Sequence, residues 1–91
     1  MALKWTRSAR SDLVRLYEFL HSVNSAVAVR VVGQLVAGTK RIPAYPRLGA
    51  RLAEFEAREV RRILVGDYEI RYEVTGTDIF ILRIFHVQED R

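Results

Sequence analysis

Three arginines and one histidine are the residues of this chain that could do chemistry: Arg61, Arg62, Arg83 and His86. Metal-free cleavage of RNA needs a general base for the 2′-hydroxyl, a general acid for the leaving oxygen, and cations that stabilise the pentavalent phosphate. Arginine and histidine can fill these roles. An imidazole at the end of a strand can equally bond a backbone carbonyl, so His86 has a structural interpretation beside the catalytic one.

Arg83 stands out because it interrupts the apolar run "IFILRIF", residues 79–85. A charged side chain inside such a strand must reach solvent, an acidic partner or a ligand. The preceding strand offers Glu69 and Glu73 as partners. We therefore expect Arg83 to project into an opening on one face of a sheet.

Other kinds of site find little support. Cysteine is absent, and His21 and His86 fall in different predicted elements without metal-ligand spacing. No glycine-rich loop precedes a Lys and a Ser or Thr, and the serines lie at or near predicted helix ends, where capping accounts for them. We therefore expect no metal and no cofactor.

Two helices are predicted in the first half of the chain. Residues 9–21 carry one apolar stripe of helical period after Ser8, with Asp12 near the positive end of the helix dipole. A second helix, capped by Asn24 or Ser25, would present a face made of Ala28, Val31, Val32, Leu35 and Ile42. The alternation in "VAVRV" also fits a strand, but about 18 residues without a turn signal is too long for one.

The glycines of the second helix, Gly33 and Gly38, either permit close approach of the first helix or sit on an exposed side. Both prolines and a glycine lie in "IPAYPRLGARL", residues 42–52, which predicts an irregular connection. Residues 2–6 have the alternation of a short edge strand.

Three strands are predicted after the loop, at residues 60–65, 68–74 and 79–85, joined by turns at Gly66-Asp67 and "TGTD". Simple alternation along the last strand groups Phe80, Leu82, Ile84 and His86 on one face and Ile79, Ile81, Arg83 and Phe85 on the other. A strand apolar on both faces belongs in the interior of a sheet. The predicted fold class is α+β in one domain, residues 1–91: an N-terminal strand, a two-helix hairpin and a three-stranded antiparallel meander, with one sheet and the helices on one face.

The net charge of +4 is unevenly distributed: residues 1–39 carry +3, residues 40–62 carry +4 and residues 63–91 carry −3. The basic middle segment can attract an acidic protein segment or nucleic acid, or simply form a solvated face. The N-terminus lacks the apolar core of a secretory signal, and no apolar stretch is long enough to span a bilayer. We expect a cytoplasmic protein with no membrane partner.

This order of elements resembles the RelE/ParE superfamily of bacterial toxin–antitoxin modules. The matching pieces are "WTRSARSDLVRLYEFL", "IPAYPRLGARL", "VRRILVGDYEIRYEV" and "IFILRIFH". The superfamily contains two activities. RelE-like members are ribosome-dependent ribonucleases that cut mRNA, and ParE-like members inhibit DNA gyrase and lack the nuclease residues.

Departures from the RelE-like pattern favour the ParE-like branch. The resemblance implies a basic residue at Arg62, which this chain keeps. It also implies an arginine where this chain has Glu69, another near Val87, and a later catalytic tyrosine, whereas no tyrosine follows Tyr72. A carboxylate facing the phosphate would oppose the charge that grows in the transition state. Superfamily nucleases that use a histidine near the C-terminus keep Arg62, Arg83 and His86 as the alternative catalytic set.

The resemblance thus implies a type II toxin that inhibits gyrase without catalysing a reaction, with the ribosome-dependent mRNA nuclease as the alternative and an inactive antitoxin-binding relative as a third interpretation. A ParD-like antitoxin would fold an acidic and apolar C-terminal segment onto the basic loop and the open sheet face. Its predicted contacts are Arg58, Arg61, Arg62 and Arg83. The expected partners are the antitoxin, in a heteromeric assembly, and DNA gyrase, without sequence-specific binding of nucleic acid.

Overall fold

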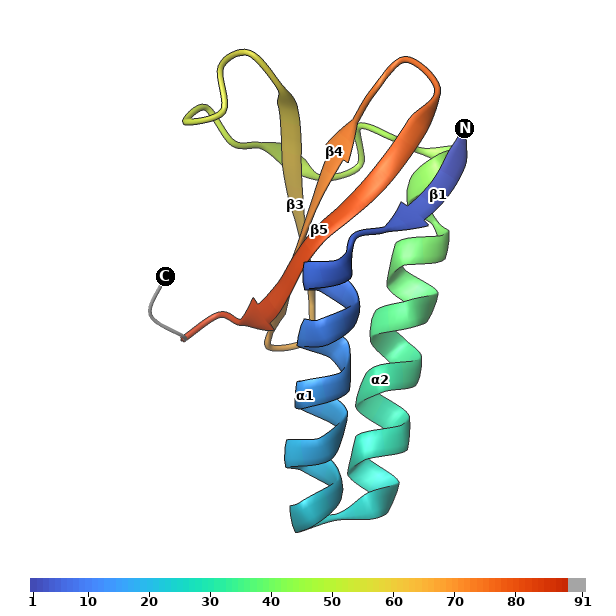
Figure 1. Ribbon diagram of the computed structural model, residues 1–91, viewed down its shortest axis with the longest axis vertical. Helices are drawn as coiled ribbons and strands as arrows, with labels where there is room; N and C mark the ends of the chain where they lie inside the picture. The colour runs from blue at the N-terminus through green and yellow to red at the C-terminus, as the bar shows by residue number, and fades with distance from the viewer. Residues whose placement is uncertain (89–91) are drawn as a thin grey trace.

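The computed structural model describes residues 1–88, so the last three residues of the predicted domain lie outside it. The elements in chain order are β1 (Ala2–Trp5), α1 (Arg7–Val23), α2 (Ser25–Lys40), the 3-10 turn η1 (Ile42–Ala44), β2 (Ala50–Arg51), β3 (Glu59–Val65), β4 (Tyr68–Val74) and β5 (Asp78–His86). All five strands form one sheet in the order β1-β5-β4-β3-β2. The predicted α+β class and its sequence of elements are confirmed (Figure 1).

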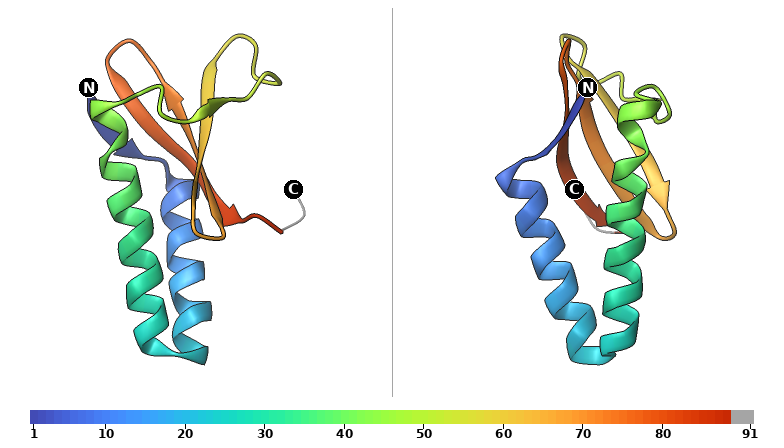
Figure 2. Two further views of the ribbon diagram at one scale, coloured as in Figure 1. Left: turned by 180° about the vertical axis from the view of Figure 1, so that it is seen from behind. Right: turned by 90° about the vertical axis from the view of Figure 1, so that its right-hand side faces the viewer.

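The two helices form an antiparallel hairpin on one face of the sheet, and the turn between them projects beyond the ends of the strands (Figure 2). Asn24 caps α2 as predicted, because its side chain accepts a hydrogen bond from the Val27 N–H. The cap of α1 is Thr6 rather than Ser8. Its extended backbone lets Oγ1 accept from the Ala9 N–H, so the helix begins two residues earlier than expected.

The core lies between this hairpin and the sheet. It consists of Ala9, Leu35, Ile42, Ile63, Ile70, Tyr72, Ile79, Ile81 and Ile84. Residues 68–74 alternate, and the face of β4 that carries Tyr68, Ile70, Tyr72 and Val74 meets this core: Ile70 and Tyr72 are fully buried, and Tyr68 and Val74 pack against it. The hairpin tip is less covered, and Phe19, Val23 and Val29 are all well exposed there.

The meander has the predicted turns but one irregularity. Gly66, with φ of 58°, supplies the positive φ that a two-residue hairpin loop with Gly first requires. Between β4 and β5, Arg71 pairs with Arg83 but Tyr72 pairs with Ile81, so Leu82 is an extra residue in β5. This bulge reverses the alternation, and the prediction from simple parity was wrong. Ile79, Ile81, Ile84 and His86 share the face toward the helices, whereas Phe80, Arg83 and Phe85 share the other.

Two expectations for the middle of the chain also change. A Cβ at Gly38 would lie 2.8 Å from Val65 Cγ2, so the close approach it permits is to β3 rather than to α1. Gly33 has no atom within 4 Å of such a Cβ and is exposed, as the second interpretation had it. The Pro/Gly connection contains η1 and a two-residue strand, β2, that were not predicted.

β1 is an edge strand parallel to β5, with Trp5 opposite Ile81 as its last pair. Beyond that point α1 follows the β5 edge (Figure 1). Within residues 1–88, no helix has the length and apolar character needed to cross a membrane.

Candidate functional site

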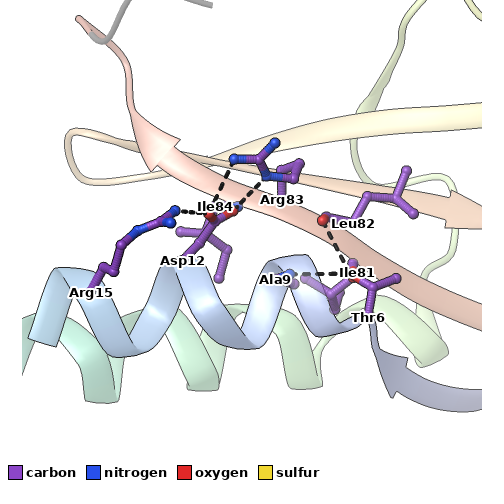
Figure 3. Close-up of polar contacts among 8 residues, drawn as sticks. All are labelled: Thr6, Ala9, Asp12, Arg15, Ile81, Leu82, Arg83 and Ile84. Atoms are coloured by element: carbon purple, nitrogen blue, oxygen red, sulfur yellow. Dashed lines mark hydrogen bonds and ion pairs between the residues drawn. The ribbon is translucent and has the colours of Figure 1, made fainter.

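Asp12 joins α1 to the part of the β5 edge that β1 does not reach (Figure 3). Its Oδ2 accepts from Arg83 Nε at 2.8 Å and from the Ile84 N–H at 2.9 Å, and its Oδ1 accepts from Arg15 at 2.6 Å and from a terminal nitrogen of Arg83 at 3.2 Å. The side chain is only 3% exposed. A buried carboxylate with four such donors is well compensated, so it is held in place rather than open to a ligand.

Thr6 begins the same connection six residues earlier. Its N–H bonds the Ile81 carbonyl, and its hydroxyl lies within hydrogen-bond distance of the Ile81 and Leu82 carbonyl oxygens. Beyond the end of β1, side chains from the beginning of α1 therefore form the hydrogen bonds with backbone groups along the edge of β5. The sequence offers Glu69 and Glu73 as acidic partners for Arg83, but among the ion pairs of residues 1–88 its partner is Asp12.

The sheet face away from the helices, here called the open face, carries a row of arginines. Arg62, Arg71 and Arg83 are opposite one another on β3, β4 and β5. Arg62 and Arg83 keep 42% and 54% of their side chains exposed. Arg71 is more covered, and its guanidinium lies 5.2 Å from the ring centre of Phe85.

Glu69 is the acidic centre of this face and is fully buried. Its carboxylate accepts from Arg62 at 3.2 Å and from Arg71 Nε at 2.8 Å. The arginine row is therefore partly neutralised from within. A cleavable phosphate placed against it would meet a carboxylate held between two of the three cations, which is unfavourable for the developing negative charge.

Arg58 and Glu73 form a separate ion pair on the open face, with both guanidinium contacts between 2.8 and 3.0 Å. The hydrogen bonds from Arg58 hold the pKa of the Glu73 carboxyl below its ordinary value. The Arg61 guanidinium similarly lowers the pKa of Glu59. These pairs are at least partly solvated, so each contributes modestly to stability.

The stabilising effect of these carboxylates should disappear in acid. A carboxyl whose pKa is lower in the folded chain contributes stability above its unfolded pKa, about 4.3, and loses it as the pH falls through the folded value. Replacing Glu73 by Gln should lower the urea midpoint slightly at pH 7 and by less at pH 3. Glu54→Gln, at an exposed loop position, is the control. If Glu73→Gln lowered the urea midpoint equally at pH 7 and pH 3, the stabilisation would not come from the ionised Glu73 carboxylate.

Arg61 faces the helix side and holds the basic loop to the sheet. Its guanidinium donates to the Gly49 carbonyl at 2.7 Å and to Glu59 at 2.8 Å. Beside it the Tyr72 hydroxyl donates to the Pro46 carbonyl and accepts from the Gly49 N–H, both at 2.9 Å. Burial raises the pKa of Tyr72, so this hydroxyl stays protonated as a donor. We call Arg61, Tyr72 and Gly49 the loop clamp.

His86 lies on the helix side of the sheet, opposite Tyr68, with their rings edge to face at 5.3 Å. Its Nδ1 accepts from the Gln88 N–H at 3.1 Å. The predicted catalytic set is thus divided. Arg62 and Arg83 share the open face, and His86 is on the other.

Arg83 and His86 nevertheless both line one cleft, at the β5 edge. It has a volume of about 190 Å³, and its walls are Leu16 and Phe19 of α1 with Tyr68, Ile84 and Phe85 of the sheet. Asp12, Arg15, Arg83 and His86 complete the lining. Apolar walls with cations at the border suit an apolar anchor that carries an acidic neighbour. Within residues 1–88, no cluster of three His, Asp or Glu side chains could hold a metal ion.

Of the predicted antitoxin contacts, Arg58, Arg62 and Arg83 lie on the open face, and Arg61 belongs to the loop clamp. Three contributors were missed. Asp12 shares the helical stripe of Ala9, Leu13 and Leu16, so its spacing already indicated burial. Arg71 is one of the alternating polar residues of β4, and neither it nor Arg15 carries a distinctive sequence signal.

Comparison with known proteins gives two findings. A family model described as "ParE toxin of type II toxin-antitoxin system, parDE" matches residues 3–91. A solved structure, "Chromosomal ParDE TA system from P. aeruginosa", superposes with a TM-score of 0.81 at 30% sequence identity, over 94% of this chain and 95% of that one. No curated protein matches.

Proposed function

Because the chain belongs to the ParE toxin family of type II toxin–antitoxin systems, we propose that it acts as an inhibitor of DNA gyrase and is neutralised by a cognate ParD-like antitoxin. The observation that carries this choice over the nuclease is the arrangement of the open face. Glu69 is buried between Arg62 and Arg71, and His86 lies on the opposite side of the sheet. A nuclease needs a general acid and a general base beside the same phosphate, whereas a protein that acts by binding does not.

The antitoxin segment is proposed to cross the open face and enter the cleft at the β5 edge. Its acidic residues would meet Arg58, Arg62 and Arg83, and an apolar side chain would occupy the space between Leu16, Phe19 and Phe85. Arg61 would contribute indirectly by holding the loop. A segment disordered in the free antitoxin can cover such an extended surface when it folds on binding.

Two assays run side by side test the target. The purified chain should inhibit supercoiling by gyrase and should leave mRNA intact on programmed ribosomes. His86→Ala should retain gyrase inhibition, since the imidazole faces the helix side and bonds its own chain. Ribosome-dependent cuts that His86→Ala abolishes would overturn the proposal in favour of the nuclease. Absence of both activities and of growth arrest would instead favour an inactive antitoxin-binding relative.

Antitoxin binding is tested separately by calorimetry with the acidic C-terminal segment of the cognate antitoxin. Arg62→Ala should weaken binding about 10-fold or more, because a charge-assisted contact in an interface contributes on the order of 1.5–3 kcal/mol. Arg30→Ala, at an exposed position of α2 beside the β3–β4 turn, is the matched control. Equal affinities for the two variants would exclude the open face as the antitoxin site.

A further inference from the structure

A second cleft of about 250 Å³ opens on the other side of the Asp12 contacts, at the start of α1. Its lining consists of Arg7, Ser8, Ser11, Asp12, Arg15 and Arg83. Every one of these side chains is polar. The cleft at the β5 edge, by contrast, has five apolar or aromatic walls. We propose that this polar cleft binds the phosphates of a nucleic-acid backbone without reading its sequence.

The charge of the cleft supports a phosphate ligand. Three guanidinium groups face one carboxylate, and that carboxylate is 3% exposed and bonded to Arg15, Arg83 and the Ile84 N–H. Two positive charges remain after the carboxylate is counted, and Arg15 and Arg83 are far more exposed than Asp12. Arg15 donates to Asp12 through one terminal nitrogen while 66% of its side chain is exposed, so it is both anchored and accessible (Figure 3). Guanidinium groups fixed in this way suit phosphate oxygens, which accept several hydrogen bonds at once.

The arrangement along α1 suits an extended backbone better than a lone phosphate. Arg7, Ser11 and Arg15 are spaced four residues apart and so lie along one side of the helix, over about 12 Å. Successive phosphates of one duplex strand advance about 3.4 Å along the axis, so this row spans several of them. The serine hydroxyls add donors of the kind that commonly contact phosphate.

An acidic peptide fits this cleft less well. Peptide segments that fold onto a protein use apolar anchors for much of their affinity, and none of the lining residues offers an apolar wall. The proposal goes beyond gyrase inhibition. It concerns contact with nucleic acid by the toxin itself, and it can be true or false whatever the toxin does to gyrase.

The test measures binding of the full-length chain alone, without gyrase or antitoxin, to a fluorescent 20-base-pair DNA duplex. Neutralisation of about three phosphates predicts a slope near −2.7 in a plot of log affinity against log salt, and hence about 40-fold weaker binding at 200 mM than at 50 mM salt. Arg7→Ala with Arg15→Ala should reduce the slope by about 2. Ser11→Glu places a negative charge in the cleft without replacing any residue that bonds Asp12, and it should abolish binding.

Arg30→Glu, on α2, lowers the net charge by two units, as the Arg7→Ala/Arg15→Ala variant does, and should retain the wild-type slope apart from a small general effect of net charge. Binding to a single-stranded RNA of 20 nucleotides is measured in the same way. The nucleic acid that binds more tightly, DNA duplex or RNA, identifies the source of the phosphates. Inorganic phosphate should compete only weakly. An equally strong response to poly-glutamate, or a loss in Arg30→Glu as large as in Ser11→Glu, would overturn the proposal.

Discussion

Replacing Asp12 by alanine is expected to lower the free energy of unfolding by about 2–4 kcal/mol, since the buried Ile84 N–H loses its acceptor and the charge-assisted hydrogen bonds from Arg15 and Arg83 are lost. The substitution removes the acceptor of the Ile84 N–H and the shared partner of Arg15 and Arg83. It also releases the start of α1 from the β5 edge. Urea unfolding followed by circular dichroism measures the loss.

Single arginine variants provide a graded control for this prediction. Arg15→Ala should cost less than about 1 kcal/mol, because its side chain is 66% exposed and the pair is largely solvated. Arg83→Ala should fall between Arg15→Ala and Asp12→Ala, because it removes both the Nε and the terminal contact while Asp12 keeps the Ile84 N–H. An Asp12→Ala variant as stable as Arg15→Ala would show that the carboxylate does not organise the edge.

Local patterns were sufficient to predict most elements of the fold. β4 was predicted with both ends correct because its alternation is uninterrupted and its turn carries Gly66. The helices were predicted from periodicity and from Asn24 as a cap. β2 was not, because two residues carry too little periodicity to be recognised.

The candidate site could be predicted less well because it depends on distant contacts. Asp12 and Arg83 are 71 positions apart in sequence, and nothing in either segment specifies the pairing. The bulge at Leu82 depends on how β5 aligns with β4, yet it decides which face Arg83 and His86 occupy. Simple alternation already places Arg83 and His86 on opposite faces, and the extra residue exchanges the apolar residues of β5 that share a face with each of them.

The loop clamp joins the basic loop to the sheet through backbone groups, so its effect extends to the cations of the loop. Arg61 and Tyr72 both bond Gly49, one at its carbonyl and one at its N–H. Arg47 and Arg51 are on either side of that glycine. Their position relative to the open face is thus set by buried contacts rather than by their own exposed side chains.

Gly49→Ala should therefore be strongly destabilising, by about 1–3 kcal/mol or more, the usual cost of forcing an extra carbon into a packed site. A Cβ at this position would collide with the Arg62 carbonyl oxygen, which β3 holds in place, and would lie 2.9 Å from the Tyr72 hydroxyl. Tyr72→Phe should cost about 1–3 kcal/mol, because the Gly49 N–H loses its acceptor in a buried site. Urea unfolding measures both.

Gly76→Ala is the matched control for the glycine. A Cβ there meets no atom within 4 Å and the backbone φ is not positive, so stability should change by less than about 0.5 kcal/mol. The double variant Gly49→Ala/Tyr72→Phe should be less destabilised than the sum of the single variants, since both act on one contact. Full additivity would mean that the tyrosine and the glycine stabilise the loop independently, and the clamp would not act as a unit.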